Sequence, residues 1–455
     1  MNRTWFKTNA AALLLLALGL ALAVFGVLYA LGPGAGKTAE DAIVIGGQTI
    51  SPDATDIAAV MAAGETEQLS RLPKLHYADL SGSENVEEIA AWAKAHPEVS
   101  VRYTVTLPDG SVLPSDTRSY DYSKAAGAEV MAAAPALSLL PGLKTLKLGA
   151  ERDSLRLDRV HELRQILPDT VFQYSFDLYG TACDLSAGTI NLFHVPVDDD
   201  AARVDLAMAC MPQLSYVDMD SCGVSNARME QLHLKYPNVK LVWRVWFGRN
   251  YSVRTDVVRI LASNPTNGGM LYNRDAEALS CCHDVRYLDL GHNKQLTDIS
   301  FVRSMPNLEV AILAMCDWTD ASPLADCPEL EYLEMFSTEC CDLTPLAGLQ
   351  KLRHLNIATN VGITDLSPLY GLTDLERLWV GSYIRVPNEQ VDEMRRHAPG
   401  CEINTSVYDD PTSGGWRYNR DGNMTERYYI LRMQFEGYKS SAYSFSWNDP
   451  LCPKQ

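Results

Sequence analysis

From residue 285 onward, apolar residues recur at intervals of 22 or 23 positions. Five stretches align without gaps and carry apolar residues at their first, fourth and sixth positions: VRYLDLGHN (285–293), LEVAILAMC (308–316), LEYLEMFST (330–338), LRHLNIATN (352–360) and LERLWVGSY (375–383). One such coil cannot bury its apolar side chains alone, so we expect the coils to stack around a common interior. The pattern predicts one short strand per coil and a parallel sheet on the concave side.

Polar and sulfur-containing residues recur in the same register. Asn293 and Asn360 occupy the ninth position of their stretches, where an amide can bond the backbone of a neighbouring coil, and Cys316 takes the same place. Cys327 and Cys340 stand where other coils have Leu or Ile, so we interpret all three as small buried apolar residues. An Asp recurs just before the convex side of each coil, where it is expected to cap a turn: Asp298, Asp320, Asp342 and Asp365.

This motif resembles that of the leucine-rich repeat family, in the 22-residue variety of internalin-like bacterial surface proteins. The resemblance implies an α/β leucine-rich repeat solenoid, with a parallel sheet on its concave face and helices or turns on its convex face. It also implies a recognition or adhesion module that binds a protein or glycan outside the cell. A structural envelope component without a discrete ligand is the alternative.

Residues 43–284 show a longer repeat of about 70 residues. The strand motif returns as LPKLHYADL (72–80), LPGLKTLKL (140–148) and MPQLSYVDM (211–219), and a helical stretch ending at a proline follows each one. Period-two alternation comes next in VSVRYTVTL (99–107), VFQYSFDL (171–178) and VKLVWRVWF (239–247), which predicts inserted β-hairpin elements. We therefore expect long units at 43–284 and compact coils with a cap at 285–407; the terminal caps are 43–60 and 384–407.

In the compact coils, the residues between the leucines are expected to face the concave side of the sheet. Strands lie about 4.8 Å apart, so residues at equivalent positions become neighbours. Clustered exposed aromatic and Arg side chains mark contact sites. The predicted partner-binding face comprises Tyr287, Ile312, Tyr332, Glu334, Phe336, His354, Asn356, Arg377 and Trp379.

The last segment, 408–455, departs from the repeat. It opens with the turn-rich YDDPTSGGWR, and ERYYILRMQF (426–435) is compatible with a short amphipathic helix. Its many aromatic residues can dock on the last coil or bind a partner. It can also fold over the concave face, and in that case the predicted partner-binding face is not exposed.

The N-terminal region changes the expected location of the protein. Residues 10–32 form a run of 23 uncharged, mostly apolar residues, with Arg3 and Lys7 before it. As a helix, this run spans roughly 34 Å, enough to cross a bilayer core. We expect a cytoplasmic tail at 1–8, a transmembrane signal anchor at 9–32 and a linker at 33–42, with the remainder exported. A cleaved signal peptide is the alternative.

Charge and motifs exclude several function classes. A net charge of −18 argues against nucleic-acid binding. The stretch LGPGAGKT (31–38) lacks the glycine that a phosphate loop needs at position 31. HELRQ (161–165) has Gln where a zinc-protease helix has its second His, VDDD (197–200) is interpreted as a solvated turn, and no cysteine spacing is typical of zinc ligation. The sequence therefore predicts no enzyme, no cofactor and no metal site.

Overall fold

The computed structural model describes residues 42–152, 155–248, 251–263, 271–381, 384–437 and 443–445. They divide into two compact units: the first spans 1–118 and 133–143, and the second spans 119–132 and 144–455. Helix α5 (Gly127–Leu137) contributes residues to both. Among the described residues, no helix combines the length and apolarity that crossing a bilayer requires. The predicted tail and anchor, the LGPGAGKT stretch and the linker up to residue 41 lie outside the described residues.

The first unit contains two hairpins and a small parallel sheet. Strands β1 (Ile43–Ile45) and β2 (Gln48–Ile50) form an antiparallel hairpin. Strands β3 (Asp56–Ala58), β4 (Tyr77–Asp79) and β5 (Ser100–Arg102) form a parallel sheet, with α3 (Thr66–Leu69) and α4 (Val86–Ala95) in the connections. A second hairpin, β6 (Thr104–Thr106) with β7 (Val112–Pro114), follows directly.

The second unit begins with two coils of the same kind. In the first coil, β8 (Ser119–Asp121), β9 (Thr145–Lys147) and β10 (Val171–Gln173) are parallel, and α6 (Leu157–Ile166) precedes β10. The hairpin of β11 (Ser175–Leu178) and β12 (Thr181–Asp184) follows. In the second coil, β13 (Thr189–Asn191), β14 (Tyr216–Met219) and β15 (Lys240–Phe247) are parallel, with α7 (Ala202–Cys210) and α8 (Asn226–Lys235) between them. Here β15 continues into an antiparallel pair with β16 (Tyr251–Arg254), which also pairs with β24 (Tyr443–Phe445).

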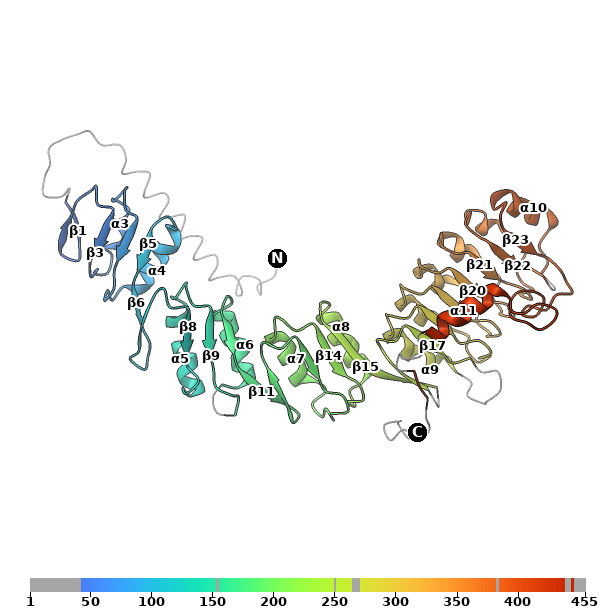
Figure 1. The fold of residues 1–455 in the computed structure, drawn as a ribbon, viewed down its shortest axis with the longest axis horizontal. Helices are drawn as coiled ribbons and strands as arrows, with labels where there is room; N and C mark the ends of the chain where they lie inside the picture. The colour runs from blue at the N-terminus through green and yellow to red at the C-terminus, as the bar shows by residue number, and fades with distance from the viewer. Residues whose placement is uncertain are drawn as a thin grey trace, which may run out of the picture. The chain divides into compact units, whose positions relative to one another are not determined.

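A seven-stranded parallel sheet carries the compact coils (Figure 1). Its strands are β17 (Arg259–Leu261), β18 (Tyr287–Asp289), β19 (Val310–Ile312), β20 (Tyr332–Glu334), β21 (His354–Asn356), β22 (Arg377–Trp379) and β23 (Glu402–Asn404). The sheet register aligns the middle residues of successive strands, from Leu288 through Leu333 and Leu355 to Leu378. The predicted parallel sheet and the predicted hairpins are therefore confirmed.

Short helices form the other side of the coils. A 3-10 helix follows each of the strands β18 to β21: η3 (Ser300–Ser304), η4 (Ser322–Asp326), η5 (Thr344–Gly348) and η6 (Ser367–Leu369). The recurring Asp accepts a backbone N–H bond of 2.8 Å at the start of every one. The connection before β18 holds α9 (Asn273–Ala276) and η2 (Glu277–Cys281), and α10 (Asn388–His397) precedes β23. The predicted turn-capping role of the Asp row is confirmed.

The interior of the coils is apolar, and hydrogen bonds connect neighbouring coils. Leu288, Leu333 and Leu355 are fully buried. Asn360 donates to the carbonyl of Met335 at 2.9 Å in the preceding coil and accepts from the Thr338 N–H at 2.8 Å. The residue before the ninth position adopts a left-handed conformation in four consecutive coils, with φ between 52° and 64°: His292, Met315, Ser337 and Thr359. Each turn thus repeats the same backbone geometry without glycine.

Cys316, Cys327 and Cys340 are buried and unpaired, as the repeat register predicts. Burial raises the pKa of the Cys316 and Cys327 thiols to about 12, so these thiols stay protonated at neutral pH. All three pack as small apolar side chains in the interior.

Candidate binding face

The predicted binding residues gather on one side of the sheet. We call this side, formed by the residues of β18–β22 that point away from the coil interior, the sheet face. The register aligns Tyr287, Val310, Tyr332, His354 and Arg377 in one row, and Asp289, Ile312, Glu334, Asn356 and Trp379 in the next. Phe336 lies just beyond β20 and packs in the same cluster. All nine predicted residues are therefore brought together.

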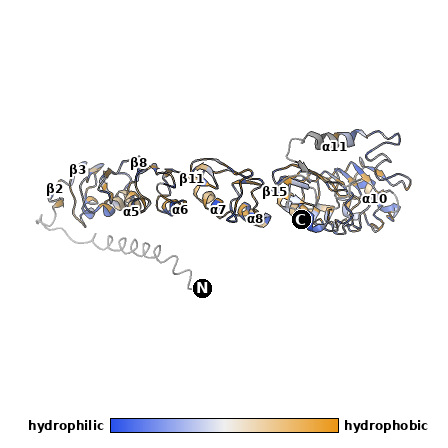
Figure 2. Ribbon diagram, turned by 90° about the horizontal axis from the view of Figure 1, so that it is seen from below, coloured by the Kyte–Doolittle hydropathy of each residue, from blue (hydrophilic) through white to orange (hydrophobic). Residues whose placement is uncertain are grey.

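The sheet face is covered by the chain's own C-terminal segment, whose contacts with it run from Pro411 to Leu431 and include the first part of α11 (Glu426–Gly437). Strands β18, β19, β20 and β22 have all three residues buried, whereas a sheet open on one side alternates buried and exposed positions, as β3 and β10 do. Figure 2 shows α11 running beside these coils. The expectation of an exposed aromatic patch is therefore wrong, and the alternative, in which the tail folds over this face, is confirmed.

Aromatic side chains of the C-terminal segment and of the coils make the contact. Trp416, Tyr428 and Leu431 of the segment join one buried cluster with Tyr287, Ile312, Tyr332, Phe336 and Trp379 of the coils. The ring centroid of Trp416 lies 5.5 Å from that of Tyr332 and 5.6 Å from that of Trp379. Because these contacts reach from β18 to β22, the segment spans several coils and does not dock on the last coil alone.

A buried ion pair lies at the centre of this contact. The Glu334 carboxylate has no solvent exposure, and it accepts bonds from Trp416 Nε1 at 2.8 Å, Arg417 Nε at 2.9 Å and the Tyr332 hydroxyl. Burial alone would lower the pKa of Arg417, but the adjacent carboxylate outweighs burial and raises it above its ordinary value. Arg417 is therefore charged, and the Glu334 carboxylate is the site on the sheet face to which Trp416 and Arg417 both bind.

Arg377 connects the segment to β22. Its guanidinium donates to the Gly415 carbonyl at 2.8 Å and lies over the Trp416 ring, 4.6 Å from the centroid. On the same sheet, Asn356 donates to the Pro411 carbonyl at 2.9 Å. The segment is thus held by backbone bonds as well as by its side chains.

His354 is the histidine of the predicted face, and its surroundings shift its pKa. Burial lowers its pKa to about 4, and the neighbouring Glu376 carboxylate opposes this shift only in part. Its Nδ1 atom is buried without a hydrogen-bond partner. The ring is therefore neutral at physiological pH.

Trp416 and Arg417 are residues of the candidate site that the repeat pattern does not reveal. The available signal is Glu334 itself, a carboxylate among aromatic and aliphatic neighbours of the face, because a buried charge requires a partner of opposite sign. The tail offers the adjacent pair Trp416-Arg417 as one such partner.

The 22-residue strand repeat, its parallel register and its bonded Asn residues define a leucine-rich repeat fold. No protein-family model matches the sequence. No curated protein sequence matches it either.

Three of the solved structures that match this chain come from two bacteria. Internalin C2 of Listeria monocytogenes is 19% identical over 48% of this chain and 80% of its own, with a TM-score of 0.28. The internalin inlF of the same species is 15% identical over 82% and 88%, with a TM-score of 0.27. A leucine-rich repeat protein of Leptospira interrogans is 15% identical over 74% and 91%, with a TM-score of 0.30. These scores do not describe a superposition of whole chains, and the fold assignment rests on the repeat register above.

Proposed function

We propose that the protein is a membrane-anchored recognition module, exported from the cell, whose sheet face binds a protein partner in competition with its own C-terminal segment. The observation that carries the proposal is the insertion of Trp416 and Arg417 against Glu334. The segment is a peptide ligand supplied by the same chain. The face is therefore complementary to an element that presents an aromatic residue beside a cation.

The charge on the face favours a protein over a glycan as the partner. Removing the segment exposes Glu334, and a ligand that covers this carboxylate again must replace the guanidinium of Arg417, because an unpaired buried charge costs several kcal/mol. Peptides supply Arg or Lys, whereas neutral sugars supply no cation. Trp, Tyr and Arg also dominate protein interface energetics, and the face carries Tyr332, Trp379 and Arg377.

A competition experiment on the full chain tests this proposal. The double variant Trp416→Ala/Arg417→Ala weakens docking of the segment on the sheet face. This opened variant is then added to a fluorescently labelled synthetic peptide of residues 408–431, and the anisotropy of the peptide is measured. We expect binding to the opened variant at roughly micromolar affinity and none to the wild type, whose face is occupied. Adding Glu334→Ala to the opened variant should abolish binding. Arg420→Ala is the matched control, because Arg420 is exposed and pairs with Asp409 inside the segment. This variant should keep the sheet face covered and, like the wild type, should not bind the peptide.

A second measurement concerns external partners and location. Crosslinking on intact cells, followed by capture of the opened variant, should recover a protein that is lost when Glu334 is also replaced. Protease added outside the cells should cleave the chain. Failure of peptide binding with an intact fold, together with no capture that depends on Glu334, would favour the alternative of a structural envelope component.

A further inference from the structure

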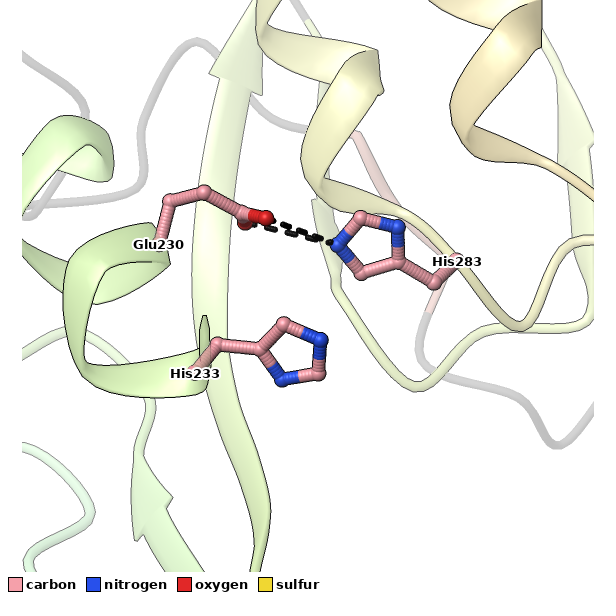
Figure 3. A group of neighbouring side chains, drawn as sticks. All are labelled: Glu230, His233 and His283. Carbon is pink, nitrogen blue, oxygen red and sulfur yellow. Dashed lines mark hydrogen bonds and ion pairs between the residues drawn. The ribbon is translucent and has the colours of Figure 1, made fainter. Parts of the chain in front are cut away.

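Three potential metal ligands meet beside β15, away from the sheet face (Figure 3). Glu230 and His233 are three residues apart on α8, which places them on one side of the helix. His283 comes from the loop between η2 and β18. One ligand atom from each residue lies within 4.8 Å of the others, and all three residues are half-buried.

One nitrogen of His283 is held by the backbone and the other faces a carboxylate. Its Nδ1 lies 3.0 Å from the Ser304 carbonyl oxygen, which only accepts, so Nδ1 carries the hydrogen. Its Nε2 faces the Glu230 carboxylate, whose oxygens lie at 3.2 and 3.3 Å. Either a proton on Nε2 or a cation bound between Nε2 and the carboxylate satisfies this contact.

The spacing suits a small divalent cation. Zn–N bonds of about 2.0–2.1 Å and Zn–O bonds of about 2.0–2.2 Å in a tetrahedron separate neighbouring ligand atoms by roughly 3.3 Å, which matches the Glu230–His283 distances. The bond from Nδ1 of His283 to a backbone carbonyl is the outer bond that metal-ligating histidines usually make.

His233 supplies a third donor. Figure 3 shows its Nε2 on the side of His283 and its Nδ1 pointing away. Its Nδ1 is buried and makes no hydrogen bond within the described chain, so the ring is not fixed by a bond at that atom. The ring stacks nearly parallel on that of His283, with centroids 4.8 Å apart and an interplanar angle of 12°. Because a metal ion lies in the plane of each imidazole it binds, the His233 ring must turn out of this stack when the ion binds.

An opening to solvent lies beside the cluster. His233, Cys281 and His283 line a cavity of about 330 Å³. Water can complete a four-coordinate shell there. We propose that Glu230, His233 and His283 bind a zinc-class divalent cation that ties α8 of the last long coil to the first compact coil. This proposal does not depend on the proposed function of the sheet face.

Zinc binding to the full chain tests the site directly. The protein, without a histidine tag, is stripped with a chelator and titrated with Zn²⁺ against a chromophoric competitor. We expect one equivalent to bind with a dissociation constant of about 1 μM or lower, and saturation to raise the melting temperature by about 3 °C. Each of Glu230→Gln, His233→Ala and His283→Gln should weaken binding at least tenfold. Cobalt(II) in place of zinc should give the intense visible absorption of a four-coordinate site.

The matched control is His397→Ala on α10. His397 Nε2 lies 3.2 Å from the Glu393 carboxylate, the same separation as in the cluster, but no third ligand joins this pair within the described residues. This variant should bind zinc as the wild type does. Equal zinc affinity in the wild type and in His233→Ala/His283→Gln, or no binding by a correctly folded wild type, would overturn the proposal.

Discussion

Replacing Arg417 by Met tests how the C-terminal segment is held. The change removes the cation next to Glu334 but keeps most of the aliphatic length. Glu334 is fully buried, and Arg417 retains 15% of its side-chain exposure. Breaking a buried ion pair costs about 3–5 kcal/mol, and Glu334 keeps two donors, the Tyr332 hydroxyl and Trp416 Nε1, worth about 1 kcal/mol each. We therefore expect a loss of about 3 kcal/mol in the free energy of docking.

The loss in docking free energy is limited, because a weakly held segment detaches and lets water reach Glu334. Hydrogen exchange of the amides in 411–431 reports this opening, and urea unfolding reports the stability of the coils. Exchange in the segment should accelerate by about two orders of magnitude, since each 1.4 kcal/mol is a factor of ten. The coils themselves should unfold at nearly the same urea concentration.

A double-mutant cycle decides whether the ion pair is the cause. Glu334→Gln in the Arg417→Met background removes the stranded charge, so the double variant should be more stable than the sum of the single losses predicts, by at least about 1.5 kcal/mol. The exposed control Arg420→Met should cost less than about 0.5 kcal/mol. Additive losses in the cycle, or an Arg417→Met cost equal to that of Arg420→Met, would refute the reasoning.

Three further predictions concern the coils. Leu355→Ala removes a fully buried side chain and should cost about 2–5 kcal/mol in urea unfolding; a cost below 1 kcal/mol would contradict the shared interior. Asn360→Ala leaves the Met335 carbonyl and the Thr338 N–H without partners and should cost about 1–3 kcal/mol by thermal unfolding, against near neutrality if water replaces the amide. Burial lowers the pKa of His354 to about 4 in the folded state, below the unfolded value of about 6.5. The unfolded chain therefore binds a proton at His354 more readily than the folded chain, so the free energy of unfolding should fall by up to about 2–3 kcal/mol as the pH drops from 6.5 toward 4. A His354→Gln variant whose stability depends on pH in the same way as that of the wild type would contradict this prediction.

The repeat part of the fold is predictable because its information is periodic. Leu288, Leu333 and Leu355 each repeat a local pattern at a fixed offset, and their neighbours in space are the equivalent residues one coil away. The same register correctly places Asn360 at a bonded turn and Cys316 in the interior. Short-range chemistry, such as the Asp that caps each 3-10 helix, follows from the same alignment.

The covering of the sheet face has no such periodicity. Glu334 and Arg417 are 83 residues apart, and no offset in the repeat relates them. Aromatic residues on the face, such as Tyr332 and Trp379, have the composition of an interface whether the partner is another protein or the same chain. The sequence therefore predicts an interaction surface but does not show which chain or segment covers it.

The candidate metal cluster is hard to predict from the sequence for a related reason. Its local signal is Glu-x-x-His on one face of a helix, at Glu230 and His233, a spacing that also occurs in metal-binding helix bundles. The third residue, His283, follows 53 positions after Glu230, and only the stacking of two successive coils brings it near. The complete ligand set therefore exists only in the folded chain and not in any one helix.

The order of the chain has a consequence for biosynthesis. Residues 416–431 leave the ribosome after all the coils whose aromatic side chains they cover, so every nascent molecule passes through a stage with Tyr332, Phe336 and Trp379 bare. Any product that ends early, at a stop codon or by proteolytic clipping before Trp416, keeps that adhesive surface permanently. Burial of this aromatic surface therefore depends on synthesis continuing through Leu431, the last residue of the segment that packs in the cluster.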